Sequence, residues 1–357
     1  MVILHIGAFG YNIYSGIYVV APQHIKMQQR IEQVAFVNIT NVIIEGIDNQ
    51  FEYTSDFNIS DLPEPFSNIE LVVFHGVYIP EYLKIYKQLK KFSIPYIIIP
   101  HGSLSVEALN KKKLKKILAN LFLFNKFIND AISVQYLSER ECRASDYGTN
   151  KFICTNGISI PKVKKNHFND DKVVFTYIGR LDSYHKGLDL LIQAVAKKKI
   201  FLKKYNCKIN IYGPDISNQA TTVKKMIVEN NVDDIIDLHD GVIGEEKEHI
   251  LLDTDLFIQT SRFEGMPMGI LEALSYGVPC IVTMGTTLGS LIEEYDAGWC
   301  SDTSVDAIAL KLEEAIKNTK NWKIKSVNAL KLIEEKFEWN KVCMKELEYY
   351  QYYINKI

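Results

Sequence analysis

The sequence predicts an α/β protein made of two doubly wound domains, each built on a parallel sheet. Its 357 residues suit about two domains at roughly 150 residues each. Short runs rich in Ile, Val, Phe and Tyr alternate with segments of helical period, a pattern typical of parallel sheets covered by helices on both faces. A polar stretch at residues 161–172 divides the runs into two series.

The apolar runs predict the strands in order. The first series covers residues 2–6, 34–39, 71–74, 96–99 and 131–134. The second series covers residues 173–178, 208–212, 235–238, 256–259 and 280–283. We therefore predict an N-terminal domain over residues 1–163 and a C-terminal domain over residues 164–340. Residues 341–357 have a helical pattern, and we expect this helix to pack back on the N-terminal domain.

Composition and motifs exclude several classes of protein. The net charge of −2 argues against a nucleic-acid binder, and the six scattered cysteines without a CxxC pair indicate reduced thiols. The N-terminus lacks the features of a signal peptide, and no run approaches the roughly 18 apolar residues of a spanning helix. We expect a cytoplasmic protein, at most peripheral to a membrane. GxGxxG, Walker A, HExxH and GxSxG motifs are absent, which disfavours dehydrogenases and P-loop enzymes.

Two cations follow the predicted strand at residues 173–178. Gly179-Arg180 comes directly after this strand, and Lys186-Gly187 precedes an amphipathic helical segment. Ligands of open parallel sheets bind beyond the carboxyl ends of the strands, and a helix N-terminus offers free N–H groups there. The pair could be a solvated pair of surface charges, but its placement favours a diphosphate site.

Two glutamates follow the predicted strand at residues 256–259. Glu264 belongs to the loop after this strand, and Glu272 lies about two turns further on, in a helix that Pro267 begins and Gly277 ends. A separation of eight residues places the two carboxylates about 80° apart around a helix, close enough to serve one ligand. A glutamate on a helix is usually a surface residue, but the glycines and apolar neighbours favour burial, and a buried carboxylate needs a partner.

These motifs together resemble glycosyltransferase family 4. The resemblance rests on Gly179-Arg180-Leu181 with Lys186-Gly187, on Glu264 and Glu272 within EGMPMGILEALSYGVPCIVT, on Asn156-Gly157-Ile158 and on Pro100-His101-Gly102. It implies a GT-B fold, in which two facing Rossmann-like domains have a cleft between them and the second domain binds most of the donor nucleotide. It also implies a retaining reaction. The likeness is strongest from residue 173 to residue 300.

The resemblance also implies roles for individual residues. Arg180 and Lys186 would neutralise the donor diphosphate, Glu264 and His101 would lie near the reacting sugar, and Glu272 would bind the ribose. The other residues it implies in donor binding are Gly16, Gly179, Gly213, Pro214, Val242, Gly265 and Met266. Gly16 stands alone where the family often has two adjacent glycines. His75 follows another predicted strand and would either contact the acceptor or be satisfied by neighbouring backbone.

Two further segments bear on cofactors and partners. Asp253-Thr254-Asp255 matches a DxD metal motif but precedes a strand instead of following one, so we expect no metal and no other cofactor. The segment from Ala108 to Asn129 contains several lysines, no acidic residue and an apolar face of helical period. Such a helix could lie on an anionic membrane surface, or it could pack on the protein with its lysines in solvent.

The sequence therefore predicts a metal-independent, retaining glycosyltransferase. Its donor would be a nucleoside diphosphate sugar, and its acceptor would be a hydroxyl of a lipid-linked glycan. The reaction would belong to the synthesis of a bacterial surface polysaccharide. One alternative is a sugar-nucleotide epimerase of similar fold, which would need no acceptor. Another is a non-catalytic partner subunit, which would be expected to lack Arg180, Lys186 or Glu272.

Overall fold

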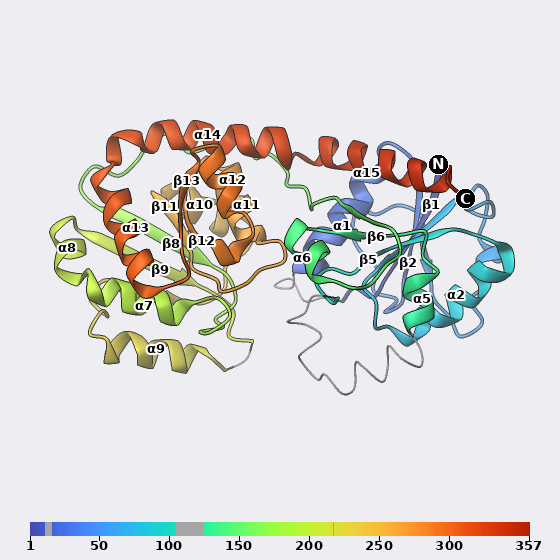
Figure 1. Cartoon of the computed structure of the whole chain (residues 1–357), viewed down its shortest axis with the longest axis horizontal. Coiled ribbons are helices and arrows are strands. Elements are labelled where there is room, and N and C mark those ends of the chain that lie inside the picture. Colours follow the sequence, from blue (N-terminus) through green and yellow to red (C-terminus); the bar gives the residue numbers. More distant parts are fainter. Residues whose placement is uncertain (11–15, 105–123, 217) are drawn as a thin grey trace. The chain divides into compact units, whose positions relative to one another are not determined.

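The chain forms two compact α/β units (Figure 1). The computed structural model describes residues 1–10, 16–104, 124–216 and 218–357. Unit 1 contains Met1–Gly157 and Trp339–Ile357, and unit 2 contains Ile158–Glu338. The sequence pattern placed these divisions after residues 163 and 340. The structure divides earlier because Ile158 forms a parallel bridge with Glu338 and donates its N–H to the carbonyl of Phe337 at 2.7 Å, within unit 2.

Unit 1 contains a seven-stranded parallel sheet in the order β3-β2-β1-β4-β5-β6-β7. All five strands predicted here are present, whereas the three-residue edge strands β3 and β7 were not predicted. The strands are β1 (Val2–Gly7), β2 (Gln33–Asn38), β3 (Gln50–Glu52), β4 (Leu71–His75), β5 (Tyr96–Ile99), β6 (Ser133–Tyr136) and β7 (Lys151–Ile153). The helices are α1 (Gly16–Gln28), η1 (Ile59–Asp61), α2 (Pro80–Phe92), α5 (Asn125–Asn129), α6 (Glu139–Ala144) and α15 (Trp339–Ile354).

The two faces of the unit 1 sheet differ in chemistry. One face is apolar, and side chains such as Leu4 and Phe74 pack there with Tyr82 of α2 in a continuous core. The opposite face carries His5 and other buried polar groups beneath α1 and α15. These two helices come from opposite ends of the chain and lie side by side (Figure 1).

Unit 2 contains a six-stranded parallel sheet in the order β10-β9-β8-β11-β12-β13. All five strands predicted here are present, and the edge strand β13 was not predicted. The strands are β8 (Val173–Ile178), β9 (Cys207–Tyr212), β10 (Ile236–His239), β11 (Leu256–Gln259), β12 (Cys280–Thr283) and β13 (Gly298–Ser301). The helices are α7 (Leu188–Lys197), α8 (Lys199–Lys204), α9 (Ala220–Glu229), α10 (Gly244–Asp253), α11 (Met268–Ser275), η3 (Met284–Thr286), α12 (Gly289–Glu294), α13 (Val305–Lys317), η4 (Thr319–Asn321) and α14 (Trp322–Lys336).

Both faces of the unit 2 sheet are apolar and covered. Side chains of β11 alternate between two cores, because Leu256 and Ile258 pack with α7 and α13 while Phe257 packs with α11 and α14. Such burial on both faces explains why the strands of this unit are nearly continuous apolar runs.

Most of the predicted basic helix lies outside the described residues. Residues 105–123, which contain most of the predicted basic helix from Ala108 to Asn129, are not described, and only its last turn is seen as α5. Within the described ranges, no helix has both the length and the hydropathy needed to cross a membrane.

Candidate active site

The loop between β8 and α7 places the two predicted cations at the carboxyl edge of the unit 2 sheet. Arg180 is exposed directly after β8. The side chain of Lys186 is 13% exposed, and its ammonium lies 2.5 Å from Oε1 of Glu264. Among the described residues, no carboxylate forms an ion pair with Arg180. The loop therefore holds one cation in a nearly buried pair and leaves the other at the surface.

Glu264 is the centre of a hydrogen-bonded cluster at this edge. Its Oε1 accepts hydrogen bonds from the ammonium of Lys186, from the hydroxyl of Ser261 at 2.7 Å and from Nε2 of Gln259 at 2.9 Å. Its side chain is 9% exposed. Burial acts to raise the pKa of Glu264, but the charge and hydrogen bond of Lys186 and the hydrogen bond of Ser261 outweigh it, so the pKa lies below its ordinary value. Glu264 is therefore an ionised carboxylate at neutral pH.

Glycines let the loops of this edge approach one another closely. A Cβ atom on Gly187 would lie 2.0 Å from the carbonyl oxygen of Thr260, and Gly187 also has a positive φ of 64°. A Cβ atom on Gly213 would lie 2.1 Å from the carbonyl oxygen of Gly179. Larger residues at these positions would force apart the loops that follow β8, β9 and β11.

A second interaction clamps the β8–α7 loop to the β11–α11 loop. The guanidinium of Arg262 forms two hydrogen bonds with the carboxylate of Asp189, at 2.7 and 2.8 Å, and lies over the ring of Tyr184. His185 accompanies it through a 2.8 Å contact between Nε2 and the carbonyl of Phe263. The sequence analysis did not single out these residues, and only the fold reveals that residues so far apart in the chain meet.

The other predicted glutamate has a cation partner of its own. Glu272, on α11, forms an ion pair with Lys247 of α10. Gly265 and Met266 lie in the loop before α11, where a Cβ atom on Gly265 would meet no atom within 4 Å. The side chain of Glu272 is 25% exposed, so the pair is only partly buried.

A pocket of about 690 Å³ opens beside these loops in unit 2. Gly213 and Val242, which the resemblance implies in donor binding, both line it, together with Leu181 from the β8–α7 loop. Pro214 is not among the lining residues, although its carbonyl accepts the N–H of Leu181. The rings of Tyr212 and His239 stack at 4.5 Å in its wall. An aromatic wall beside a polar loop suits a nucleoside.

His101 lies in unit 1, two residues after the end of β5. It adopts a positive φ of 48°, which is unusual for a residue other than glycine, and it is followed by Gly102 with a φ of 81°. The N–H of Gly102 donates to Oε1 of Glu141 at 2.9 Å, which anchors the turn. Burial raises the pKa of Glu141 despite the two backbone N–H groups that it accepts. Strained backbone of this kind is concentrated at functional sites.

The remaining sequence predictions concern Gly16, His75 and the DxD segment. Gly16 begins α1, and its neighbours at residues 11–15 lie outside the described ranges. His75 is 1% exposed, and both of its ring nitrogens contact other histidines, so it is not free to meet an acceptor. Asp255 is fully buried at the amino end of β11 and accepts the backbone N–H groups of Asn169 and Val174, which is a structural role.

The match to a family model lies within unit 2. A model of the family described as glycosyl transferases group 1 matches residues 160–331. Residues 160–331 belong to the glycosyl transferases group 1 family. Unit 2 is therefore a glycosyltransferase domain, and the predicted resemblance to glycosyltransferase family 4 is consistent with this match.

Relatives and a solved structure extend the likeness. A putative colanic acid biosynthesis glycosyltransferase, WcaL of Salmonella typhimurium, is 25% identical over 36% of this chain and 32% of its own length, so the match spans about a third of that protein. An uncharacterized glycosyltransferase of Haemophilus influenzae is 26% identical over 67% of this chain and 72% of its own length. The structure of Anabaena Alr3699/HepE in complex with UDP and glucose covers 98% of this chain with a TM-score of 0.73 at 14% identity. The predicted GT-B fold is confirmed.

Proposed function

We propose that the protein is a retaining glycosyltransferase that transfers a sugar from a nucleoside diphosphate sugar to a hydroxyl of a glycan. The observation that carries the proposal is the joint placement, at one edge of the unit 2 sheet, of the Lys186–Glu264 pair, the exposed Arg180 and the pocket of about 690 Å³. This edge offers positive charge for a diphosphate next to an aromatic wall for a base. The similarity to a protein whose structure contains UDP and glucose supports the same donor class.

The proposed chemistry depends on charge that is already in position. As the bond to the leaving diphosphate breaks, negative charge grows on a phosphate oxygen, and Arg180 and Lys186 stabilise it. The leaving phosphate oxygen can accept the proton of the attacking hydroxyl on the same face of the sugar, which retains the anomeric configuration. Glu272 would hold the ribose, and Glu264 would orient Lys186 and face the sugar.

The donor is tested first by binding. A thermal-shift screen of nucleoside diphosphates and their sugars should show one base that raises the melting temperature, because a ligand that binds only the folded state stabilises it. Arg180→Met should remove this shift, while Lys197→Met, at an exposed lysine of the same unit, should keep it. A chain whose melting temperature responds to no nucleotide would contradict the proposal.

The reaction itself is tested with the donor so found. Nuclear magnetic resonance of the product should show the anomeric configuration of the donor sugar. Incubation with the donor alone should give no epimer, since an epimer without acceptor would favour the sugar-nucleotide epimerase instead. Turnover should survive excess EDTA, because the two cations take the place of a metal ion. Loss of turnover with EDTA and its return with manganese would overturn metal independence.

We further propose that the acceptor is lipid-linked, in bacterial surface polysaccharide synthesis. The similarity to a putative colanic acid biosynthesis enzyme and the basic segment from Ala108 to Asn129 support this. Each lysine near an anionic bilayer contributes about 1 kcal/mol, screened within about 8 Å at physiological salt. Replacing Lys111, Lys112, Lys113, Lys115 and Lys116 by Gln should lower salt-sensitive sedimentation with anionic liposomes at an unchanged melting temperature. Unchanged sedimentation would assign these lysines to solvent.

A further inference from the structure

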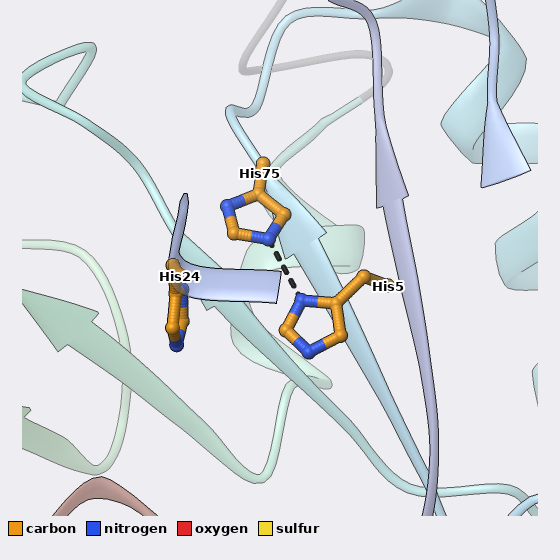
Figure 2. A group of neighbouring side chains, drawn as sticks. All are labelled: His5, His24 and His75. Atoms are coloured by element: carbon orange, nitrogen blue, oxygen red, sulfur yellow. Dashed lines mark hydrogen bonds between the residues drawn. The ribbon is translucent and has the colours of Figure 1, made fainter. Parts of the chain in front are cut away.

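Unit 1 contains a buried cluster of histidines that the proposed reaction does not use. His5, on β1, His24, on α1, and His75, at the end of β4, are 0%, 5% and 1% exposed, and one nitrogen of each lies within 4.8 Å of those of the others (Figure 2). A run of hydrogen bonds extends from this cluster in two directions. It reaches Glu346 of α15 on one side and His101 on the other.

The separation of the rings favours a hydrogen bond over a shared metal ion. Nδ1 of His5 and Nε2 of His75 are 2.8 Å apart (Figure 2). Two nitrogens bound to one tetrahedral zinc ion at 2.0–2.1 Å would be about 3.4 Å apart. The observed contact is instead that of a ring N–H donating to the lone pair of the next ring.

Glu346 determines the orientation of Gln28 at one end of this run. Burial acts to raise the pKa of Glu346, but the charge and hydrogen bond of His24 and hydrogen bonds from Gln135 and Gln28 outweigh it, so the pKa is lowered and the group is ionised. An ionised carboxylate accepts only, so Gln28 must turn its Nε2 toward Oε2 of Glu346, at 2.6 Å. Its carbonyl Oε1 then faces Nε2 of His5 at 2.8 Å.

The orientation of Gln28 determines the tautomers of three histidines in turn. Because Gln28 Oε1 accepts, Nε2 of His5 carries the proton and Nδ1 of His5 is a lone pair. That lone pair accepts from Nε2 of His75, so Nδ1 of His75 accepts from Nε2 of His101 at 3.0 Å. Burial lowers the pKa of His5 and of His101 to about 3 and that of His75 well below its ordinary value, which agrees with neutral rings.

We propose that Glu346, Gln28, His5 and His75 form a relay that holds His101 in the tautomer with its proton on Nε2 and a lone pair on Nδ1. These four are positioning residues. The consequence for catalysis rests on the proposed function: His101 would accept, through Nδ1, a hydrogen bond from a hydroxyl of the substrate. The buried glutamate on the last helix would thereby control the chemistry of a loop at the carboxyl end of β5.

The relay has only two consistent directions, and Gln28 selects between them. In the reverse direction each ring carries its proton on Nδ1, and the lone pair of His5 Nε2 would face the lone pairs of Gln28 Oε1. Gln28→Met removes this acceptor at similar side-chain length. The forward direction would then bury an unpaired N–H of His5, which costs more than leaving a ring lone pair unpaired. The variant should therefore reverse the tautomer of His101.

The test is nitrogen-15 nuclear magnetic resonance of protein labelled at histidine. Two-bond correlations distinguish the two tautomers, and the variants His5→Asn, His75→Asn and His101→Asn assign the signals. In the unaltered protein, His5, His75 and His101 should all carry the proton on Nε2 at pH 7. In Gln28→Met the proton of His101 should be on Nδ1. Gln29→Met is the control, because the hydrogen bonds of the Gln29 amide within the described part of the chain go to backbone groups of Val34 and Asp48 and not to the relay.

Each outcome of this test decides the proposal. A proton on Nδ1 of His101 in the unaltered protein, or an unchanged His101 in Gln28→Met, would overturn the relay whatever reaction the protein catalyses. One equivalent of zinc in the purified protein, measured by elemental analysis, would also overturn it. In a transfer assay, Gln28→Met should lower kcat about tenfold, the scale of one hydrogen bond, and leave nucleotide affinity unchanged. If the spectra are as expected and no sugar is transferred, only the proposed function fails.

Discussion

Each unit of the molecule buries an ionised carboxylate, and the two are stabilised in different places. Glu264 lies at the carboxyl edge of the unit 2 sheet, among loops, and its main partner is the ammonium of Lys186. Glu346 lies against a face of the unit 1 sheet, and its partners are the imidazole of His24 and two glutamine amides.

The difference shows what each kind of burial permits. A cation at a sheet edge is held by one carboxylate and can still turn toward an anionic ligand, because loops and not strands surround it. A network enclosed between a sheet face and two helices cannot exchange partners with a ligand, so it acts only by orienting groups within the protein. We therefore expect substitutions at Glu264 and Lys186 to change turnover directly. Substitutions at Glu346 should change turnover only through the groups that Glu346 orients.

The largest effect is expected at Lys186. Lys186→Met removes a cation that we propose to face the leaving diphosphate, so turnover should fall by about 10² or more. It also leaves Glu264 buried without its cation, which should lower the free energy of unfolding by about 3 kcal/mol. Lys197→Met, which breaks an exposed pair with Asp306, should change the free energy of unfolding by less than about 1 kcal/mol. Equal losses in the two variants would contradict the difference between the pairs.

The pH dependence of the same variant follows from the direction of the pKa shift. The lowered pKa of Glu264 means that its pair with Lys186 stabilises the fold above the ordinary carboxyl pKa of 4.5, and that this contribution is lost as pH falls through the lowered value. In Lys186→Met, burial still acts to raise the pKa of Glu264, but the lysine charge that opposed it is gone. Protonation of Glu264 then removes the free-energy cost of burying an unpaired carboxylate. The gap in unfolding free energy between the two proteins should therefore narrow from pH 7 to pH 4. A difference in unfolding free energy that does not change with pH would show that charge attraction does not stabilise the Lys186–Glu264 pair.

Substitutions of Glu264 and of Glu272 should change different kinetic parameters. Glu264→Gln should lower kcat by about 10², because the amide neither orients Lys186 as well nor presents charge to the sugar, with nucleoside diphosphate affinity nearly unchanged. Glu272→Gln should mainly raise the donor KM, by about tenfold, because the ribose does not change during reaction. Calorimetric titration of the diphosphate accompanies the kinetics. These roles would be wrong if Glu264→Gln abolished diphosphate binding while Glu272→Gln left the donor KM untouched.

The smallest effect on turnover is expected at Glu346. Glu346→Gln keeps the shape of the side chain but lets Gln28 take either orientation, so only part of the population of His101 should reverse its tautomer. We expect kcat to fall a few-fold and the unfolding free energy to fall by about 1–3 kcal/mol, the cost of imperfectly paired buried groups. Diphosphate affinity should match that of the unaltered protein. A loss of diphosphate binding would mean that unit 2 had been disturbed.

The sequence alone predicted most of the fold and the residues at the unit 2 edge. The inner strands are mostly apolar runs of four to six residues because helices cover both faces of each sheet, and such runs can be recognised without a structure. The strands that escaped prediction, β3, β7 and β13, lie at sheet edges. β3 and β7 have only three residues each, and β13 reads Gly-Trp-Cys-Ser, without the Ile, Val, Leu or Phe that mark the inner strands. Arg180, Lys186 and Glu264 were predictable because each directly follows, or lies within one loop of, a strand end.

The partners of those residues were decided by tertiary structure. The sequence shows that a buried glutamate needs a cation, but pairing Glu264 with Lys186 and Glu272 with Lys247 depends on which loops the parallel sheet brings together. The relay in unit 1 was beyond prediction for a stronger reason. Glu346 and Gln28 are 318 residues apart in the chain, and no local pattern marks a tautomer. Chain chemistry determines which groups must be satisfied when buried, and only the packing of α15 on α1 decides which groups satisfy them.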